Sequence, residues 1–155
     1  MFSFLVNDHC FYEWLEKDSK EFLVCAEDVS GGQTMINLTN KIMESYSPAE
    51  NGFIWTDFKL SPDGNTLAVL GCYWARPTVL KLFNFSEPLL LPLKELNEIE
   101  LLGNDEIIVG WIDNKTIKMK GVKREQVAEY SEGGGFRMKT LSETPIEREI
   151  NIDVI

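Results

Sequence analysis

Nucleophilic chemistry in this sequence would depend on its single histidine, His9. A Cys–His or Ser–His pair needs the imidazole within hydrogen-bond reach of the nucleophile, so a cysteine would have to lie beside His9. The three cysteines are Cys10, Cys25 and Cys72. Adjacent side chains such as those of His9 and Cys10 point in different directions on most backbones. We therefore interpret His9 as a surface or capping residue near Asp8 and predict no catalytic residue.

The cysteines and carboxylates form no known metal-binding or redox pattern. Three widely spaced cysteines make neither a disulfide framework nor a CxxC motif, which favours a reducing, cytoplasmic compartment. The acidic spacing of an EF-hand is absent, and we expect no metal and no cofactor. With 25 Asp and Glu residues, a carboxylate pair for glycoside-type hydrolysis stays open, although no spacing singles out a pair.

Two aspartates share a local pattern, because each follows a tryptophan by two positions. The segments are Trp55-Thr56-Asp57 and Trp111-Ile112-Asp113. Their offset does not match the interval at which similar strands recur in this chain, so we interpret the similarity as a coincidence. Asp113 is expected to open a tight turn, and Trp55 and Asp57 are kept as candidate binding residues.

The most unusual local chemistry lies around Tyr73, Trp74 and Arg76. These residues separate two apolar strands, and Trp, Tyr and Arg are enriched at the energetic centres of protein interfaces. At the rim of a sheet, such a loop is well placed to contact a partner. The alternative is that Tyr73 and Trp74 cap the hydrophobic core at the end of the sheet.

Most elements that position these residues are predicted to be strands. The exception is residues 11–21, where apolar side chains at i, i+3 and i+4 predict a short N-terminal helix. In residues 54–60, one set of alternate positions holds Ile54, Thr56, Phe58 and Leu60 and the other holds Trp55, Asp57 and Lys59, which is the period of two of a strand. Residues 99–102 and 107–112 are expected to form a hairpin around a short turn. The glycine-rich run at 131–139 lacks the pattern of a phosphate-binding loop, and we predict a flexible hairpin tip or a mobile loop.

Comparable strand–turn–strand segments recur along the chain. Leu23, Leu67 and Ile107 occupy equivalent positions at intervals of 44 and 40 residues. Within this pattern, residues 61–71 (SPDGNTLAVLG) resemble the core of WD40-like β-propeller repeats, in which Ser-Pro-Asp-Gly joins two strands of a blade. The resemblance implies blades of three or four strands. The Gly-His…Trp-Asp signature is absent, and about three units are fewer than the roughly four blades of the smallest closed propellers.

We therefore expect a single all-β domain over residues 1–155, an antiparallel meander of about three propeller-blade-like units with a short N-terminal helix. The units are expected at about 21–50, 54–97 and 98–130. A C-terminal strand at 146–152 is expected to pair with an N-terminal strand and tie the ends together. The alternative is that exposed sheet edges pair between two chains and form a homodimer.

The charge of the chain bears on its partners. A net charge of −10 argues against nucleic-acid binding, because phosphate backbones select clustered Lys and Arg. No window approaches the roughly 18 apolar residues of a membrane span, so we expect no membrane partner. The sequence favours a non-enzymatic module that binds a basic protein, such as an acidic inhibitor or immunity-type protein. The alternatives are a carboxylate-based hydrolase or lyase, and a structural subunit that completes its sheet by oligomerisation.

Overall fold

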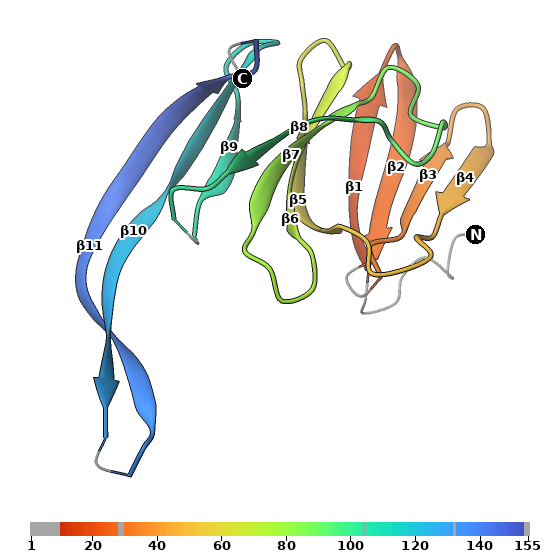
Figure 1. The fold of residues 1–155 in the computed structure, drawn as a ribbon. Coiled ribbons are helices and arrows are strands. Elements are labelled where there is room, and N and C mark those ends of the chain that lie inside the picture. The colour runs from red at the N-terminus through yellow and green to blue at the C-terminus, as the bar shows by residue number, and fades with distance from the viewer. Residues whose placement is uncertain (1–9, 28–29, 104, 132, 154–155) are drawn as a thin grey trace.

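The computed structural model describes residues 10–27, 30–103, 105–131 and 133–153. These residues form eleven strands in three antiparallel sheets and no helix, which confirms the all-β class. The sheets lie side by side, with strands β5 to β8 in the middle sheet (Figure 1). In the described part of the chain, no helix is long and apolar enough to cross a membrane.

The first sheet has the order β1-β2-β3-β4, so each strand pairs with the next one along the chain. Its strands are β1 (Cys10–Lys17), β2 (Lys20–Glu27), β3 (Gln33–Asn37) and β4 (Ile42–Tyr46). The helix predicted over residues 11–21 is therefore wrong, because this segment contains most of β1, a turn and the start of β2.

The turn between β1 and β2 gives the physical reason for this difference. Asp18 and Ser19 have φ values of 51° and 56°, and two successive positive φ values are the pattern of a type I′ turn, whose twist matches paired strands. Trp14 and Leu15 then lie on opposite faces of β1. Leu15 packs against the core, whereas Trp14 is exposed. Hairpin pairing and burial therefore outweigh the helical spacing.

The middle sheet has the order β5-β6-β7-β8. Its strands are β5 (Ile54–Leu60), β6 (Thr66–Cys72), β7 (Val79–Asn84) and β8 (Glu95–Glu100). The predicted hairpin around the Ser-Pro-Asp-Gly turn is confirmed, since β5 and β6 pair on either side of that turn, from Leu60 opposite Leu67 to Ile54 opposite Cys72.

Side chains of the Ser-Pro-Asp-Gly turn hold its shape. The Ser61 hydroxyl donates to Asp63 Oδ1 (2.6 Å), which also accepts the Asn65 backbone N–H (3.1 Å). These hydrogen bonds, that from Ser61 first, hold the pKa of Asp63 below its usual value. Gly64 has a φ of 71°, a conformation that favours glycine. The Asp63 backbone N–H donates to Asn114 Oδ1 (2.9 Å), which connects the turn to the third sheet.

The third sheet has the order β11-β10-β9. Its strands are β9 (Ile107–Trp111), β10 (Thr116–Tyr130) and β11 (Phe136–Asn151). The expected hairpin of residues 99–102 with 107–112 is wrong, because β8 pairs with β7, where Ile99 lies opposite Leu80, and β9 pairs with β10. The C-terminal segment at 146–152 pairs with β10 and not with an N-terminal strand, since a short turn already brings these two strands together.

The middle sheet is buried on both faces by its neighbours. An apolar cluster that includes Trp55 and Phe83 fills the space between the first and middle sheets. A second cluster, which includes Leu80 and Ile117, fills the space between the middle and third sheets. Alternate residues of β6 contribute to the two clusters, which explains why this strand is apolar throughout.

Candidate functional site

Residues 73–78 form the loop between β6 and β7, so Tyr73, Trp74 and Arg76 lie together at the rim of the middle sheet. The Arg76 backbone N–H donates to the Tyr73 carbonyl oxygen (3.0 Å), and Ala75 has a φ of 58°. The chain therefore reverses over four residues. This tight turn holds Trp74 at the outer end of the loop.

Tyr73 is the inward-facing residue of the loop. Its ring centroid lies 5.4 Å from that of Phe53, and its hydroxyl accepts a hydrogen bond from Lys81 Nζ (3.2 Å). The same Nζ lies 5.0 Å from the Phe53 ring centroid and 5.1 Å from the Tyr73 ring centroid. Tyr73 thus packs onto the end of the core and fixes the loop to the middle sheet.

Lys81 is a buried ammonium group on β7. Its Nζ lies 2.7 Å from Glu95 Oε2 and 2.9 Å from Glu98 Oε2. Burial alone lowers the pKa of a lysine, but the hydrogen bonds to Glu95, Glu98 and Tyr73 together outweigh it and raise the pKa of Lys81 above its usual value. The charged ammonium therefore links β7, β8 and the loop.

A groove of about 450 Å³ lies between the loop and β8, and we call it the rim groove. Its walls include Arg76, Val79 and Leu101, together with the exposed carboxylates Glu98 and Glu100. Apolar walls beside carboxylates suit the long aliphatic stem and cationic end of a lysine or arginine side chain. The rim groove therefore has groups that can contact a basic side chain. Trp74 lies in the same loop as the wall residue Arg76 and is exposed.

Trp55 and Asp57 lie on β5 and do not belong to the rim groove. Trp55 is 1% exposed, and its ring centroid lies 5.6 Å from that of Phe83. It is a core residue that offers no surface to a macromolecular partner. Asp57 is half-buried and lies 3.5 Å from the ammonium group of Lys59 on the same strand.

Four described carboxyl groups have shifted pKa values, and all four are lowered. The Lys115 backbone N–H donates to Asp113 (2.7 Å) and is the main cause of its lowered pKa, as expected of a residue that opens a turn. The others are Asp63, Glu129 and Glu147, each lowered chiefly by a side-chain hydrogen bond. A general acid needs a raised pKa, and none of these four groups has one. His9 lies outside the described residues.

A second candidate surface is the outer part of the β10–β11 hairpin, residues 122–145, which we call the arm. β9 pairs with β10 only as far as Lys120, and beyond it the two strands project from the body (Figure 1). Apart from Val122 and Glu129, the described arm residues are exposed. The predicted hairpin tip is confirmed, since the Ser131 backbone N–H donates to the Gly135 carbonyl oxygen (2.8 Å).

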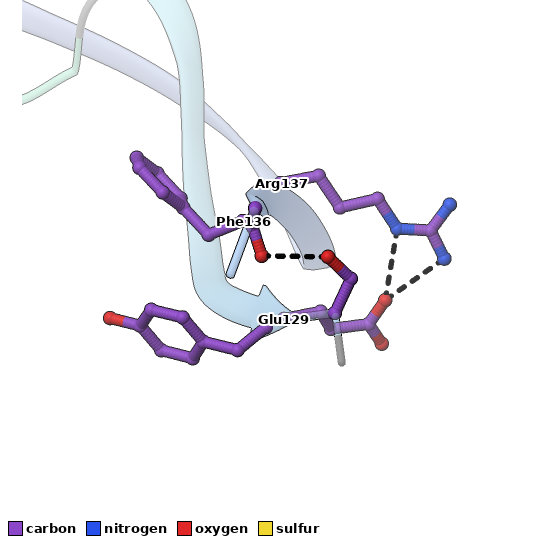
Figure 2. A pocket seen from close by; sticks show the side chains of 6 residues that line it. Glu129, Phe136 and Arg137 are labelled. Atoms are coloured by element: carbon purple, nitrogen blue, oxygen red, sulfur yellow. Dashed lines mark hydrogen bonds and ion pairs between the residues drawn. The ribbon is translucent and has the colours of Figure 1, made fainter. Parts of the chain in front are cut away.

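One face of the arm tip is apolar, and we call it the apolar tip face. Tyr130 lies opposite Phe136, and Ala128 lies opposite Met138, so these four side chains share one face of the hairpin. The rings of Tyr130 and Phe136 have centroids 6.1 Å apart. Figure 2 shows the Phe136 ring pointing away from the ion pair of Glu129 and Arg137. Tyr130 is 80% exposed and Phe136 67%.

The other face of the arm tip is charged and internally paired. Glu129 accepts hydrogen bonds from Arg137 Nη2 (3.0 Å) and Lys139 Nζ (2.8 Å), the first of which is drawn in Figure 2. The pKa of Glu129 is lowered, first by Lys139 and then by Arg137. The tip therefore has one face suited to water and one face suited to an apolar partner.

A buried ion pair fixes the base of the arm. Arg148 on β11 donates from Nε to Glu106 Oε1 (2.8 Å) and from Nη2 to Glu106 Oε2 (3.0 Å), and the Leu102 backbone N–H donates to the same Oε2 (2.6 Å). A Cβ atom on Gly121 would lie 2.8 Å from Glu106 Cα, so glycine permits this close approach. The base of the arm is therefore held to the body by this ion pair and by close packing.

The sequence contains one signal for the arm, but its meaning becomes clear only when the pairing of the two strands is known. Aromatic residues flank the glycine-rich tip at equal distance on its two strands, but a two-faced ribbon becomes evident only from the register.

In the described ranges, no group of three or more His, Cys, Asp or Glu side chains is placed to hold a metal ion. Comparison of the whole chain with protein-family models, with curated proteins and with solved structures found no match.

Proposed function

We propose that this chain is a non-enzymatic protein-binding module that recognises a basic protein through Trp74 and the rim groove. The exposure of Trp74 carries the proposal. Its side chain is 65% exposed, although the neighbouring Tyr73 fixes the loop through buried contacts. A large aromatic side chain on a fixed backbone buries much apolar surface on binding and loses little conformational entropy.

The charge of the partner follows from the charge of the groove and of the chain. Glu98 and Glu100 line the rim groove, and the chain carries a net charge of −10. A basic partner would be attracted during its approach, and salt would weaken that attraction by screening. An acidic inhibitor or immunity-type protein that covers a basic site on an enzyme is the form of this function that we favour.

We also propose that the three sheets are consecutive WD40-like propeller blades. Two observations support this architecture. The first and middle sheets are four-stranded meanders in chain order, as propeller blades are. The initial strand of the middle sheet, β5, contacts β9, the initial strand of the third sheet, and both β1 and β2 of the first sheet. On this architecture the Tyr73–Arg76 loop lies at one end of the second blade.

The binding proposal is tested by co-purification from native lysate with the tagged chain as bait. We expect a basic protein to be retained by the wild type and lost with Trp74→Ala. Trp14→Ala is the matched control, because Trp14 is 60% exposed on a different sheet. Glu100→Gln and added salt should each reduce retention. Equal retention by the wild type and Trp74→Ala, unaffected by salt, would overturn the proposal.

A further inference from the structure

We infer that the apolar tip face of the arm is a self-association surface that packs against the same face of a second copy of this chain. This surface is separate from the rim groove, and the inference does not depend on the proposed partner. It would give the chain two interaction surfaces, one for a basic protein and one for itself.

The arm lacks the cover that a stable sheet needs. An isolated two-stranded ribbon is marginally stable in water, and three or more strands or a packed face are needed for independent stability. Beyond Lys120, β10 pairs only with β11, and among the described residues none of the arm side chains is fully buried. An apolar face of four side chains next to a self-paired charged face indicates that a second molecule supplies the cover.

The distribution of charge favours a second copy as that molecule. Residues 122–145 contain four acidic and four basic side chains, so the whole net charge of −10 belongs to the rest of the chain. Two bodies in direct contact would repel each other. Contact through the tips keeps the bodies apart by about the length of an arm, roughly 40 Å for twelve residues, and repulsion is screened within about 8 Å at physiological salt.

The same charge argument disfavours a basic foreign protein at the tip. Such a partner would be drawn to the acidic body, whereas an electroneutral apolar patch provides no electrostatic steering. Interfaces between identical chains are more apolar than other interfaces, and a two-fold axis brings a patch into contact with its own copy. The composition of the apolar tip face matches this type of interface.

The size of the patch sets the expected strength of the contact. The exposed parts of Tyr130, Phe136 and Met138 amount to about 400 Å² for each copy, since a buried aromatic side chain covers about 150 to 250 Å². A dimer would bury about 800 Å² in total, which is below the roughly 1,200 Å² of stable specific interfaces. We therefore expect a reversible dimer with a dissociation constant of about 10 to 100 μM.

Sedimentation velocity of the full chain from about 2 to 500 μM, a range that brackets this constant, tests the inference. The wild type should change from monomer to dimer as its concentration rises. The double variant Tyr130→Thr with Phe136→Thr should weaken dimerisation by about tenfold or more, while threonine keeps the strand propensity of the arm. Val127→Thr is the matched control on the charged face, where Val127 lies opposite Lys139, and should leave the dimer unchanged.

A second measurement on the wild type alone guards against misfolded variants. Backbone amides of residues 126–140 should exchange hydrogen more slowly at high than at low protein concentration, whereas those of residues 73–78 should not change. A wild type that stays monomeric over the whole range, or a Val127→Thr variant as impaired as the double variant, would overturn the inference. Trp74→Ala should leave the dimer intact. A failure of self-association can therefore be distinguished from a failure of the proposed binding to a basic partner.

Discussion

The middle sheet and the arm are built from the same kind of antiparallel pairing, but they differ in what covers them. In the middle sheet, Phe83 is packed against Trp55 and Phe53 between two sheets. In the arm, Phe136 contacts Tyr130 and otherwise faces solvent. Strand pairing is thus a local property of the chain, whereas the stability that a side chain supplies depends on the elements that cover it.

The largest expected effect comes from truncating one phenylalanine in each region. Phe83→Ala should reduce the free energy of unfolding by about 3 to 5 kcal/mol, because it opens a cavity in the core. Phe136→Ala should change it by less than about 0.5 kcal/mol, because the side chain is exposed in the monomer. Urea unfolding at about 2 μM protein, well below the expected dissociation constant of the dimer, measures both. Similar losses for the two variants would contradict the comparison.

A smaller difference is expected for two glutamates that pair with arginine. Glu106→Gln leaves the Arg148 guanidinium without its buried counter-charge and should destabilise the protein by about 3 kcal/mol. Glu129→Gln removes an ion pair from an exposed ribbon and should leave the melting temperature unchanged. Thermal unfolding followed by circular dichroism compares the two. A fall in melting temperature for Glu129→Gln as large as that for Glu106→Gln would show that the arm is more strongly packed than described.

The smallest expected effect concerns the two turns. Asp63→Ala should cost about 1 kcal/mol at pH 7, since it removes the acceptor of the Ser61 and Asn65 hydrogen bonds, whereas Ser131→Ala in the arm turn should have no measurable effect. The folded pKa of Asp63 is lowered from 3.8, so its carboxylate stabilises the fold above that value. This contribution is lost as the pH falls through the folded pKa. Urea unfolding at a series of pH values from 7 downwards should therefore show the Asp63→Ala difference at pH 7 and a smaller difference as the pH falls below 3.8.

Strands β5 to β7 of the middle sheet could be predicted because local signals and tertiary cover agree there, whereas part of β8 was wrongly expected to pair with residues 107–112. Alternation over residues 54–60 and the Ser-Pro-Asp-Gly turn both specify a hairpin, and both neighbouring sheets bury it. At residues 11–21 the helical spacing of apolar side chains conflicted with a two-residue turn at Asp18 and Ser19. The segment forms the paired strands β1 and β2 and not a helix. The partner of residues 146–152 was missed because the hairpin at the glycine-rich turn is longer than its local signal indicates, with pairing from Tyr130 opposite Phe136 to Thr116 opposite Asn151.

The candidate site was predicted in part for a related reason. Residue types placed Tyr73, Trp74 and Arg76 in a loop, and they do lie in one. The sequence placed Trp74 in a loop and Trp55 within a strand, but it did not show that Trp55 is buried, because that depends on the packing of the first sheet against β5. The arm was missed as a surface because exposure on both faces of a ribbon is a tertiary property.

The order of the strands has a consequence for how the chain folds as it is synthesised. Each sheet is complete within one contiguous segment, residues 10–46, 54–100 and 107–151. A ribosome that releases the chain from its N-terminus can therefore finish one sheet before the next emerges, and each new sheet adds onto an apolar face that is already formed. The β10–β11 hairpin emerges after the first and middle sheets, so the tip that we assign to self-association forms on a body in which those two sheets can already be folded.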